Sequence, residues 1–391
     1  MTGTILIAYI YNNNGMATWC IEAAKALSLK GYNVILVKKR DIELDVASLQ
    51  HVQLVSFDEE PSNNRNIFNR IKAKLKQYIY LIPFIQPDNQ FLPKLFKHLS
   101  FLGINQVDAI LLNQSNLLSH SFQIKQYVVA WANPPYFINY LKNAFTTAKS
   151  IKQIHQGVLA AIFWYKSDLY SYKNAAGVMS VSENLKNNIL RLVQNTNVDT
   201  IYPGVSNQYI TEIKRPIAKK IKLVMMALHI EEKRKRLTWA INQIQQLQAY
   251  YHLIELTLIG DYSASFKRKI EHEKVPVIFL GKLSRHQALN ELQKNDLMIF
   301  ASSVDDWGYV QIEAMSCGLA VMAPKASPFD EIIGNDDYLF DNNDFIEKLQ
   351  KIIINPVKLE TDKQYFLEKY NDKFSGNVFA EKLINIINAT A

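Results

Sequence analysis

The chain of 391 residues is too long to fold around one typical hydrophobic core, so its length predicts two domains. Apolar residues make up 48% of the sequence and the mean hydropathy is −0.10, values typical of a globular protein in water. No apolar run approaches the roughly 20 residues that a membrane span needs, which argues against an integral membrane protein. The two cysteines, Cys20 and Cys317, show neither a pairing pattern nor metal-ligand spacing, which favours a reduced, cytoplasmic setting without a disulfide.

The net charge of +8 is unevenly distributed along the chain. Residues 1–200 hold 20 basic against 12 acidic side chains, whereas residues 201–391 hold 24 of each. A basic first half fits an anionic membrane surface or nucleic acid. Because no recognised nucleic-acid-binding motif accompanies it, we expect no nucleic acid partner.

The N-terminal segment predicts the opening of a doubly wound parallel sheet. A short apolar run from Ile5 to Ile10 lacks a basic leader and runs into Asn12 to Gly15, so we interpret it as a strand and not as a signal peptide. Helical spacing follows until Gly31, and Val34 to Val37 is the next strand. The loop lacks the G-x-G-x-x-G pattern, so a dinucleotide oxidoreductase is disfavoured.

Residues 65–102 interleave basic with aromatic side chains. Such a mixture can lie in a lipid interface, where the cations meet anionic headgroups and the rings meet the acyl boundary. A solvated helix followed by a proline-broken connection explains the pattern equally well.

Further strands are predicted along the rest of the first half. Ala109 to Leu112 and Tyr127 to Trp131 are apolar runs, and the second leads into Asn133. Residues 137–175 are helical and rich in aromatic residues, which favours core packing over a platform for stacking bases. Val178 to Val181 is another strand, and a linker runs from Tyr202 to Pro216.

The second half repeats the alternation of strands and helices. Ile221 to Met226 is a strand, after which a basic run from Lys233 to Arg236 enters a helix expected to continue to Leu247. Further strands are Leu256 to Ile259 and Val277 to Leu280, each followed by a glycine. From about Gln364 to Leu383 the spacing is helical.

The stretch from Ser302 to Glu331 carries the strongest signal. A strand, Leu297 to Ala301, feeds a polar loop, and helical spacing follows from Val310 until Gly318. The first turn of a helix carries unpaired N–H groups and a partial positive charge, which favour an anion such as a phosphate. Asp305 and Glu313 flank this loop with seven residues between them, and such carboxylates accept hydrogen bonds from vicinal hydroxyls.

This spacing resembles the signature of retaining glycosyltransferases of the GT-B fold, family 4, in which two glutamates with seven residues between them flank a glycine-containing loop. Three positions depart from the family pattern: Asp305 replaces the first glutamate, Leu228 an arginine and Asn133 a histidine. The positions that match the family pattern are Ser302, Trp307, Gly308, Glu313 to Met315, Gly318 and Glu331 to Ile333.

The resemblance implies an α/β protein of the GT-B class, with two Rossmann-like, doubly wound parallel-sheet domains that face a cleft. Residues 1–206 would form the acceptor-side domain and residues 207–369 the donor-binding domain. The final helix, from about residue 370 to 391, would pack on the first domain.

The resemblance also assigns roles to individual residues. The catalytic group would be Lys233, Asp305 and Glu313: Lys233 holds the diphosphate, Asp305 the hydroxyls of the donor sugar and Glu313 those of the ribose. Asn133 lies on the acceptor side, and Lys235 or Arg236 supplies the cation missing at Leu228. The expected donor-binding residues are Gly15, Lys235, Arg236, Gly281, Leu283, Asp306, Trp307, Gly308 and Tyr309.

The implied activity is transfer of a sugar from a UDP- or GDP-sugar to a hydroxyl of a glycan, lipid-linked or protein acceptor, with retention. Neither a cofactor nor a metal is expected. The protein would be cytoplasmic, with an anionic membrane surface as a further partner through residues 65–102. Two alternatives remain open: a non-catalytic partner subunit of the same fold, and an isomerase of nucleotide sugars.

Overall fold

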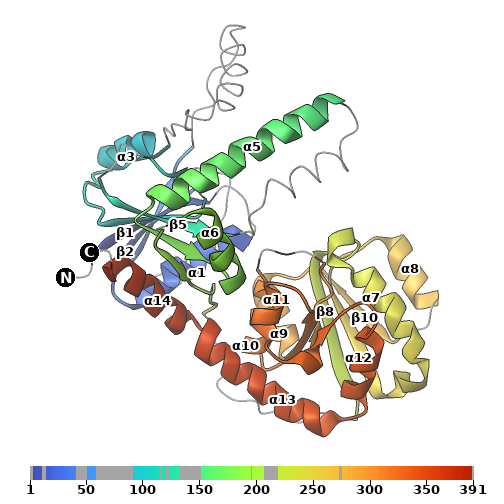
Figure 1. Ribbon diagram of the computed structural model, residues 1–391. Coiled ribbons are helices and arrows are strands. Elements are labelled where there is room, and N and C mark those ends of the chain that lie inside the picture. Colours follow the sequence, from blue (N-terminus) through green and yellow to red (C-terminus); the bar gives the residue numbers. More distant parts are fainter. Residues whose placement is uncertain are drawn as a thin grey trace. The chain divides into compact units, whose positions relative to one another are not determined.

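The computed structural model describes residues 3–10, 15–40, 51–58, 91–114, 117–119, 123–131, 151–194, 196–206, 219–272, 275–303, 305 and 307–389. The chain divides into two compact units, Met1–Tyr202 with Phe379–Ala391, and Pro203–Val378. In each unit, helices lie on both faces of a parallel sheet (Figure 1). The predicted fold class, two doubly wound α/β domains, is confirmed.

The first unit is built on a seven-stranded parallel sheet with the order β3-β2-β1-β4-β5-β6-β7. Its strands are β1 (Thr4–Ile10), β2 (Asn33–Lys38), β3 (Val52–Ser56), β4 (Ala109–Leu112), β5 (Lys125–Ala130), β6 (Gly177–Ser180) and β7 (Val198–Thr200). Its helices are α1 (Gly15–Leu29), α3 (Phe91–Phe101), α5 (Ile151–Asn174), α6 (Glu183–Leu192) and most of α14 (Gly376–Ala389).

The second unit is built on a six-stranded parallel sheet with the order β10-β9-β8-β11-β12-β13. Its strands are β8 (Ile221–His229), β9 (Ile254–Asp261), β10 (Val277–Gly281), β11 (Leu297–Ile299), β12 (Ala320–Pro324) and β13 (Leu339–Phe340). Its helices and short helical turns are η2 (Lys233–Lys235), α7 (Leu237–Ile244), η3 (Gln245–Leu253), α8 (Ala264–His272), α9 (Arg285–Leu292), α10 (Tyr309–Ser316), α11 (Phe329–Ile333), η4 (Asp336–Tyr338), α12 (Phe345–Ile353), α13 (Pro356–Lys369) and η5 (Tyr370–Phe374).

The strands inside each sheet are rich in apolar residues because helices cover both faces of a parallel sheet. All four residues of β4 are buried, whereas β3 and β10, which lie at sheet edges, keep partly exposed positions. Apolar runs therefore predicted the interior strands. The sequence interpretation missed three edge strands: β3, in which polar residues interrupt the apolar ones, β7, with one apolar residue, and β13, with only two residues.

Helix α14 returns the end of the chain to the first unit. The ring of Phe379 packs edge-on against that of Trp19, with centroids 5.9 Å apart. The hydroxyl of Tyr127 donates a hydrogen bond of 3.0 Å to the carbonyl of Ile387. The helical tail that the spacing predicted is divided into three parts, since η5 follows α13 and Ser375 separates η5 from α14.

A buried ion pair joins α13 to the sheet of the second unit. Asp296 Oδ1 lies 3.2 Å from Lys363 Nζ, and their side chains are only 1% and 3% exposed. The other carboxylate oxygen accepts a hydrogen bond of 2.9 Å from the backbone N–H of Lys222 in β8. Both charges are thus paired and hydrogen-bonded, which is the condition for keeping ionised groups in a protein interior.

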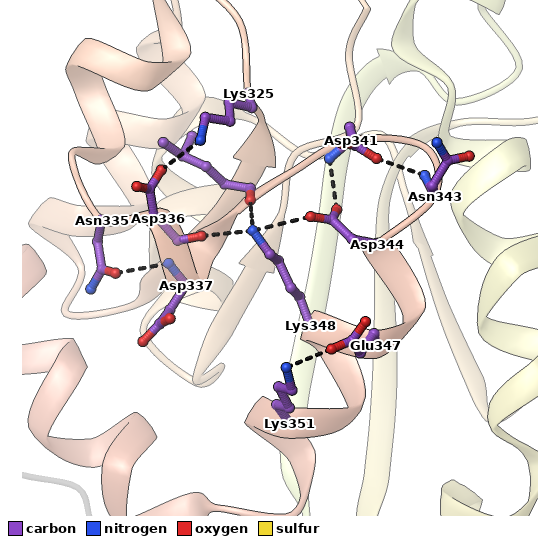
Figure 2. Close-up of polar contacts among 11 residues, drawn as sticks. Lys325, Asn335, Asp336, Asp337, Asp341, Asn343, Asp344, Glu347, Lys348 and Lys351 are labelled. Atoms are coloured by element: carbon purple, nitrogen blue, oxygen red, sulfur yellow. Dashed lines mark hydrogen bonds and ion pairs between the residues drawn. The ribbon is translucent and has the colours of Figure 1, made fainter.

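The acidic turns on either side of β13 enclose the ammonium group of Lys348 (Figure 2). The Nζ atom lies 2.8 Å from the carbonyl oxygen of Asp336, 2.5 Å from that of Leu339 and 3.2 Å from Asp344 Oδ2. The positive charge among these oxygen atoms is therefore supplied by the chain itself, through Lys348. Among the described residues, no group of three or more His, Cys, Asp and Glu side chains could hold a metal ion.

Within the described part of the chain, no helix combines the length and the apolar character needed to cross a bilayer.

Candidate functional site

The site is built on the loop between β11 and α10, at the carboxyl end of the second sheet. Ligands of open α/β sheets bind at this edge, where strands give way to helices. The helical spacing predicted from Val310 is confirmed as α10, whose N-cap is Gly308 and which ends before Gly318 with φ of +78°. No acidic residue lies in the first turn of α10, so the helix does not neutralise its own positive end.

Glycine is required at position 308 by its neighbours. A Cβ atom there would lie 2.7 Å from the side-chain amide carbon of Gln311, which is completely buried beneath the loop. Trp307 is also buried, with its ring edge-on to Phe374 at 6.1 Å. The predicted residues Trp307, Gly308 and Tyr309 thus form a tightly packed start to the helix.

The turn η2 is fastened to this loop through its backbone. The carbonyl oxygen of Arg234 accepts hydrogen bonds from Ser303 N at 2.9 Å, Ser303 Oγ at 3.2 Å and Ser302 Oγ at 3.3 Å. These contacts explain the predicted importance of Ser302, which is buried. They also bring the basic run of the sequence to the side of Asp305.

Asp305 lies between two cations of that run. Its Oδ1 atom is 2.7 Å from a terminal nitrogen of Arg234, and its Oδ2 atom is 2.6 Å from Lys235 Nζ. Burial tends to lower the pKa of Arg234, but Asp305 and Glu232 outweigh it, so the pKa lies above its ordinary value. Arg234, a member of the basic run that was given no role from the sequence, thus lies beside Asp305.

The two cations predicted as alternatives point in different directions. Lys235 lies against Asp305, whereas Arg236 stacks on the ring of Trp239 at 4.0 Å and donates a hydrogen bond of 2.5 Å to Asn342. Burial lowers the pKa of Arg236. Arg236 has a left-handed backbone, with φ of +54°, which ends η2, and the helix predicted after the basic run begins at Leu237 as α7. Its predicted continuation to Leu247 is wrong, because α7 ends at Ile244 and the tighter turns of η3 follow, with a kink at Leu247.

Lys233 stands at the start of η2 with an exposed side chain, and no carboxylate among the described residues pairs with it. Leu228, where the family pattern has an arginine, is 59% exposed at the end of β8. The structure therefore places two cations against the loop, those of Arg234 and Lys235, and Lys233 precedes them in the same turn, although position 228 supplies none.

Glu313, one turn into α10, is paired with a residue that the sequence interpretation missed. Arg285 directs its Nε and one terminal nitrogen to Glu313 Oε1, each at 2.9 Å, and the Glu313 side chain is only 11% exposed. Arg285 is the first residue of α9, the positive end of a helix, where a cation costs about 0.3–1 kcal/mol. An arginine at the first position of a predicted helix is unfavourable, and this was the sequence signal that could have indicated an acidic partner in another element.

Gly281 and Leu283, both predicted to bind the donor, form the loop that leads into α9. Gly281 has φ of +72°, a conformation that favours glycine, and an added Cβ would meet nothing within 4 Å. Ser284 and Gln287 then form a capping box that fixes the start of α9 and hence the position of Arg285. The predicted residues Gly281 and Leu283 thus precede, in the chain, the arginine that contacts Glu313.

Of the other predicted residues, Gly15 begins α1 in the first unit, while Asn133 and Asp306 lie outside the described residues.

The fold and these elements together define the GT-B class of two-domain proteins. Residues 210–370, which lie in the second unit, match the family model for Glycosyl transferases group 1, and the predicted resemblance to GT-B glycosyltransferases is confirmed.

The chain is also similar to one protein in sequence and to two solved structures in fold. The chain is 27% identical over 179 residues to N-acetyl-alpha-D-glucosaminyl L-malate synthase of Bacillus anthracis, a match that covers 41% of this chain and only 44% of that protein. In structure it resembles sucrose-phosphate synthase of Thermosynechococcus elongatus, with a TM-score of 0.69, 14% identity, and coverage of 100% and 99% of the two chains. It also resembles Anabaena Alr3699/HepE in complex with UDP-glucose, with a TM-score of 0.62, 14% identity, and coverage of 99% and 100%.

Proposed function

We propose that this chain transfers a sugar from a nucleoside diphosphate sugar to a hydroxyl group of an acceptor, with retention at the anomeric carbon. The observation that carries the proposal is the meeting of three features at one loop: the N-terminus of α10, the cations of η2 and the carboxylates Asp305 and Glu313. An anion and several hydroxyls are the groups that such a loop can hold together.

The diphosphate would be stabilised by cations of the chain itself. As the bond from the sugar to the phosphate breaks, negative charge develops on the leaving oxygen, and fixed dipoles and cations stabilise it best when water is excluded. Lys233 and Lys235 supply the cations and the first turn of α10 supplies N–H donors. We therefore propose that the reaction proceeds without a divalent metal.

The two carboxylates would hold the neutral parts of the donor. Asp305 would accept hydrogen bonds from hydroxyls of the sugar once the incoming diphosphate draws Arg234 and Lys235 away from it. Glu313, held by Arg285, would accept those of the ribose.

Retention follows if the leaving phosphate acts as the base. The bond between the anomeric carbon and the phosphate oxygen breaks, the acceptor oxygen bonds to the same face of that carbon, and its proton passes to the departing phosphate oxygen. No protein carboxylate needs to attack the sugar. In this scheme Asp305 and Glu313 bind and orient the donor and take no proton.

UDP-sugars are the donors that we propose to test first, because Alr3699/HepE is a structural relative in complex with UDP-glucose. The acceptor would be a glycan, a lipid-linked sugar or a protein. Docking at the inner face of a membrane is supported by α3, on which Lys94, Lys97 and Phe101 share one exposed face. Leu102, next along the chain, is 47% exposed.

A thermal-shift screen of the full chain with UDP, GDP and ADP, in EDTA, tests the donor site. Binding to the folded state at 100 times the dissociation constant stabilises by about 2.7 kcal/mol, enough to raise the Tm measurably. A screen of nucleotide sugars for slow hydrolysis then identifies the donor. A rise in Tm with no transfer or hydrolysis of any nucleotide sugar would favour the non-catalytic partner subunit, and no response to any nucleotide would contradict the proposed function.

Membrane docking has its own test. The chain should float with vesicles containing about 30% anionic lipid and stay unbound at high salt, since headgroup attraction is screened by ions. The double variant Lys94→Glu, Lys97→Glu should lose flotation, with Lys294→Glu, just beyond the end of α9, as the control. Equal flotation of the three proteins would contradict the docking proposal.

A further inference from the structure

Arg285 is attached to Glu313 by a geometry more specific than general charge attraction. Two of its N–H groups converge on the same oxygen, Oε1, each at 2.9 Å. The guanidinium side chain is 42% exposed, whereas that of the carboxylate is 11% exposed. The pair therefore reaches from the surface of α9 into the packed side of α10.

The position of Arg285 is not explained by helix α9. The start of α9 is already satisfied by the capping box of Ser284 and Gln287, and a cation there opposes the helix dipole. Since α9 does not favour an arginine at its start, we explain Arg285 by its contact with Glu313. The partner is the carboxylate of Glu313, one turn into the helix that follows the β11 loop.

Glu313 needs such a partner in order to accept hydrogen bonds. A carboxylate buried to this degree stays ionised only when a cation or several donors compensate its charge. The planar guanidinium also fixes the direction of the carboxylate, which the ammonium of a lysine, a point charge on a flexible chain, does much less well. Arg285 thus controls both the charge and the orientation of Glu313.

We propose that Arg285 is a positioning residue of the donor site, which holds Glu313 so that its carboxylate reads the ribose hydroxyls of the nucleotide. The inference rests on the proposed function and extends it. Its consequence is a preference for ribonucleotides over 2′-deoxyribonucleotides, because a site built to bind a hydroxyl rejects a ligand that lacks it. Arg285 produces this preference without touching the reacting atoms.

Calorimetric titration of the full chain with UDP and 2′-deoxy-UDP, and with GDP and 2′-deoxy-GDP, tests the inference. Wild type should prefer the ribonucleotide by about 10-fold or more, the effect of one hydrogen bond to a charged group. Arg285→Gln should reduce this ratio to near one, and Arg285→Lys should restore part of it. Adding Glu313→Gln to Arg285→Gln should change the ratio no further.

Two control variants separate this role from general damage. Lys294→Gln removes an exposed ion pair with Glu291 just beyond the end of the same helix and should leave affinity and ratio unchanged. Lys235→Gln removes a cation from the diphosphate side and should weaken both nucleotides equally, again with an unchanged ratio. The Tm of every variant is measured alongside, and Arg285→Lys carries the test if Arg285→Gln does not fold.

The outcomes distinguish this inference from the proposed function. If wild type binds UDP or GDP without discriminating against its deoxy analogue, or if Arg285→Gln keeps the wild-type ratio, the nucleotide site stands and the role of Arg285 is refuted. If wild type binds neither nucleotide, the proposed function fails and the inference fails with it.

Discussion

The two acidic residues of the β11–α10 loop are held in contrasting ways. Asp305, whose side chain is 17% exposed, lies in the loop itself, here called the open end, and has Arg234 on one carboxylate oxygen and Lys235 on the other. Glu313, 11% exposed, lies one turn into α10, here called the packed end, and receives two N–H groups of Arg285 on one oxygen. The two carboxylates are similarly buried, so the source of their cations distinguishes them, and not their exposure. The cations of Asp305 come from the turn proposed to bind the diphosphate, for which an incoming phosphate would compete, whereas Arg285 comes from another helix.

This contrast gives a physical reason for the shortened carboxylate. An aspartate at position 305 is reached by the cations of η2 while it stays close to the backbone of its own loop. The diphosphate must compete with it for Arg234 and Lys235, so Asp305 serves as their counter-ion while the site is empty. In the proposed site the diphosphate does not compete with Glu313 for its cation, because Arg285 belongs to another helix, α9.

The largest expected effect calibrates the cost of breaking a buried pair. Asp296→Ala leaves Lys363 charged and almost completely buried, so we expect a loss of about 3–5 kcal/mol in the free energy of unfolding. Urea denaturation measures it. The double variant Asp296→Leu, Lys363→Met, which removes both charges, should regain most of the loss. A loss below about 1 kcal/mol for Asp296→Ala would show that burial does not decide the cost here.

Next in size is the effect of Lys233 on turnover. Its ammonium has no carboxylate partner among the described residues, so it is available to charge that develops on the leaving phosphate. Lys233→Ala should lower kcat about 100-fold, as loss of one preorganised donor does, with little change in KM. Steady-state kinetics on the identified donor measure both, with Lys294→Ala as the control. A rise in KM at constant kcat would mean that Lys233 contributes only to ground-state binding.

At the packed end, Glu313→Ala should weaken binding of the nucleotide sugar about 10- to 100-fold, since hydrogen bonds to charged groups are worth about 1.5–3 kcal/mol. It also removes the ion pair of Arg285 with Glu313, and the Arg285 side chain, 42% exposed, can be hydrated. Titration calorimetry gives the affinity. Wild-type affinity in a folded variant would contradict the role assigned to Glu313.

The smallest effect is expected at the open end. Asp305→Ala should lower the free energy of unfolding by about 1 kcal/mol, because Arg234 is 47% exposed and keeps its pair with Glu232. It should strengthen binding of UDP alone by about 2- to 5-fold, within the range of one exposed ion pair, since the diphosphate no longer competes for the two cations. The gain should fall at high salt. Weaker UDP binding would show that Asp305 is not a counter-ion for these cations.

The sequence predicted those parts of the fold that depend on local pattern. The strand, loop and helix around Gly308 follow from a buried apolar run, polar punctuation and helical spacing, all within one segment. Interior strands such as β4 were equally plain because parallel sheets bury both faces. The edge strands β7 and β13 have too few apolar residues to show a period.

The ion pairs of the site could not be predicted in the same way. Arg234 and Asp305 are 71 positions apart, and Arg285 and Glu313 are 28 apart, so only the packing of helices brings them together. The direction of the Arg236 side chain depends on the left-handed backbone of Arg236 itself, a conformation that arginine rarely adopts and that the sequence does not predict. Distances in space, and not residue types, decided which cations belong to the loop.

The attachment of α14 to the first unit has a consequence for how the protein is made. The ring that packs against Trp19 and the carbonyl that Tyr127 binds both follow the second unit in the sequence. During translation the strands of the first sheet are therefore made well before the helix that packs on them. The first core can close only after the whole second unit has been made.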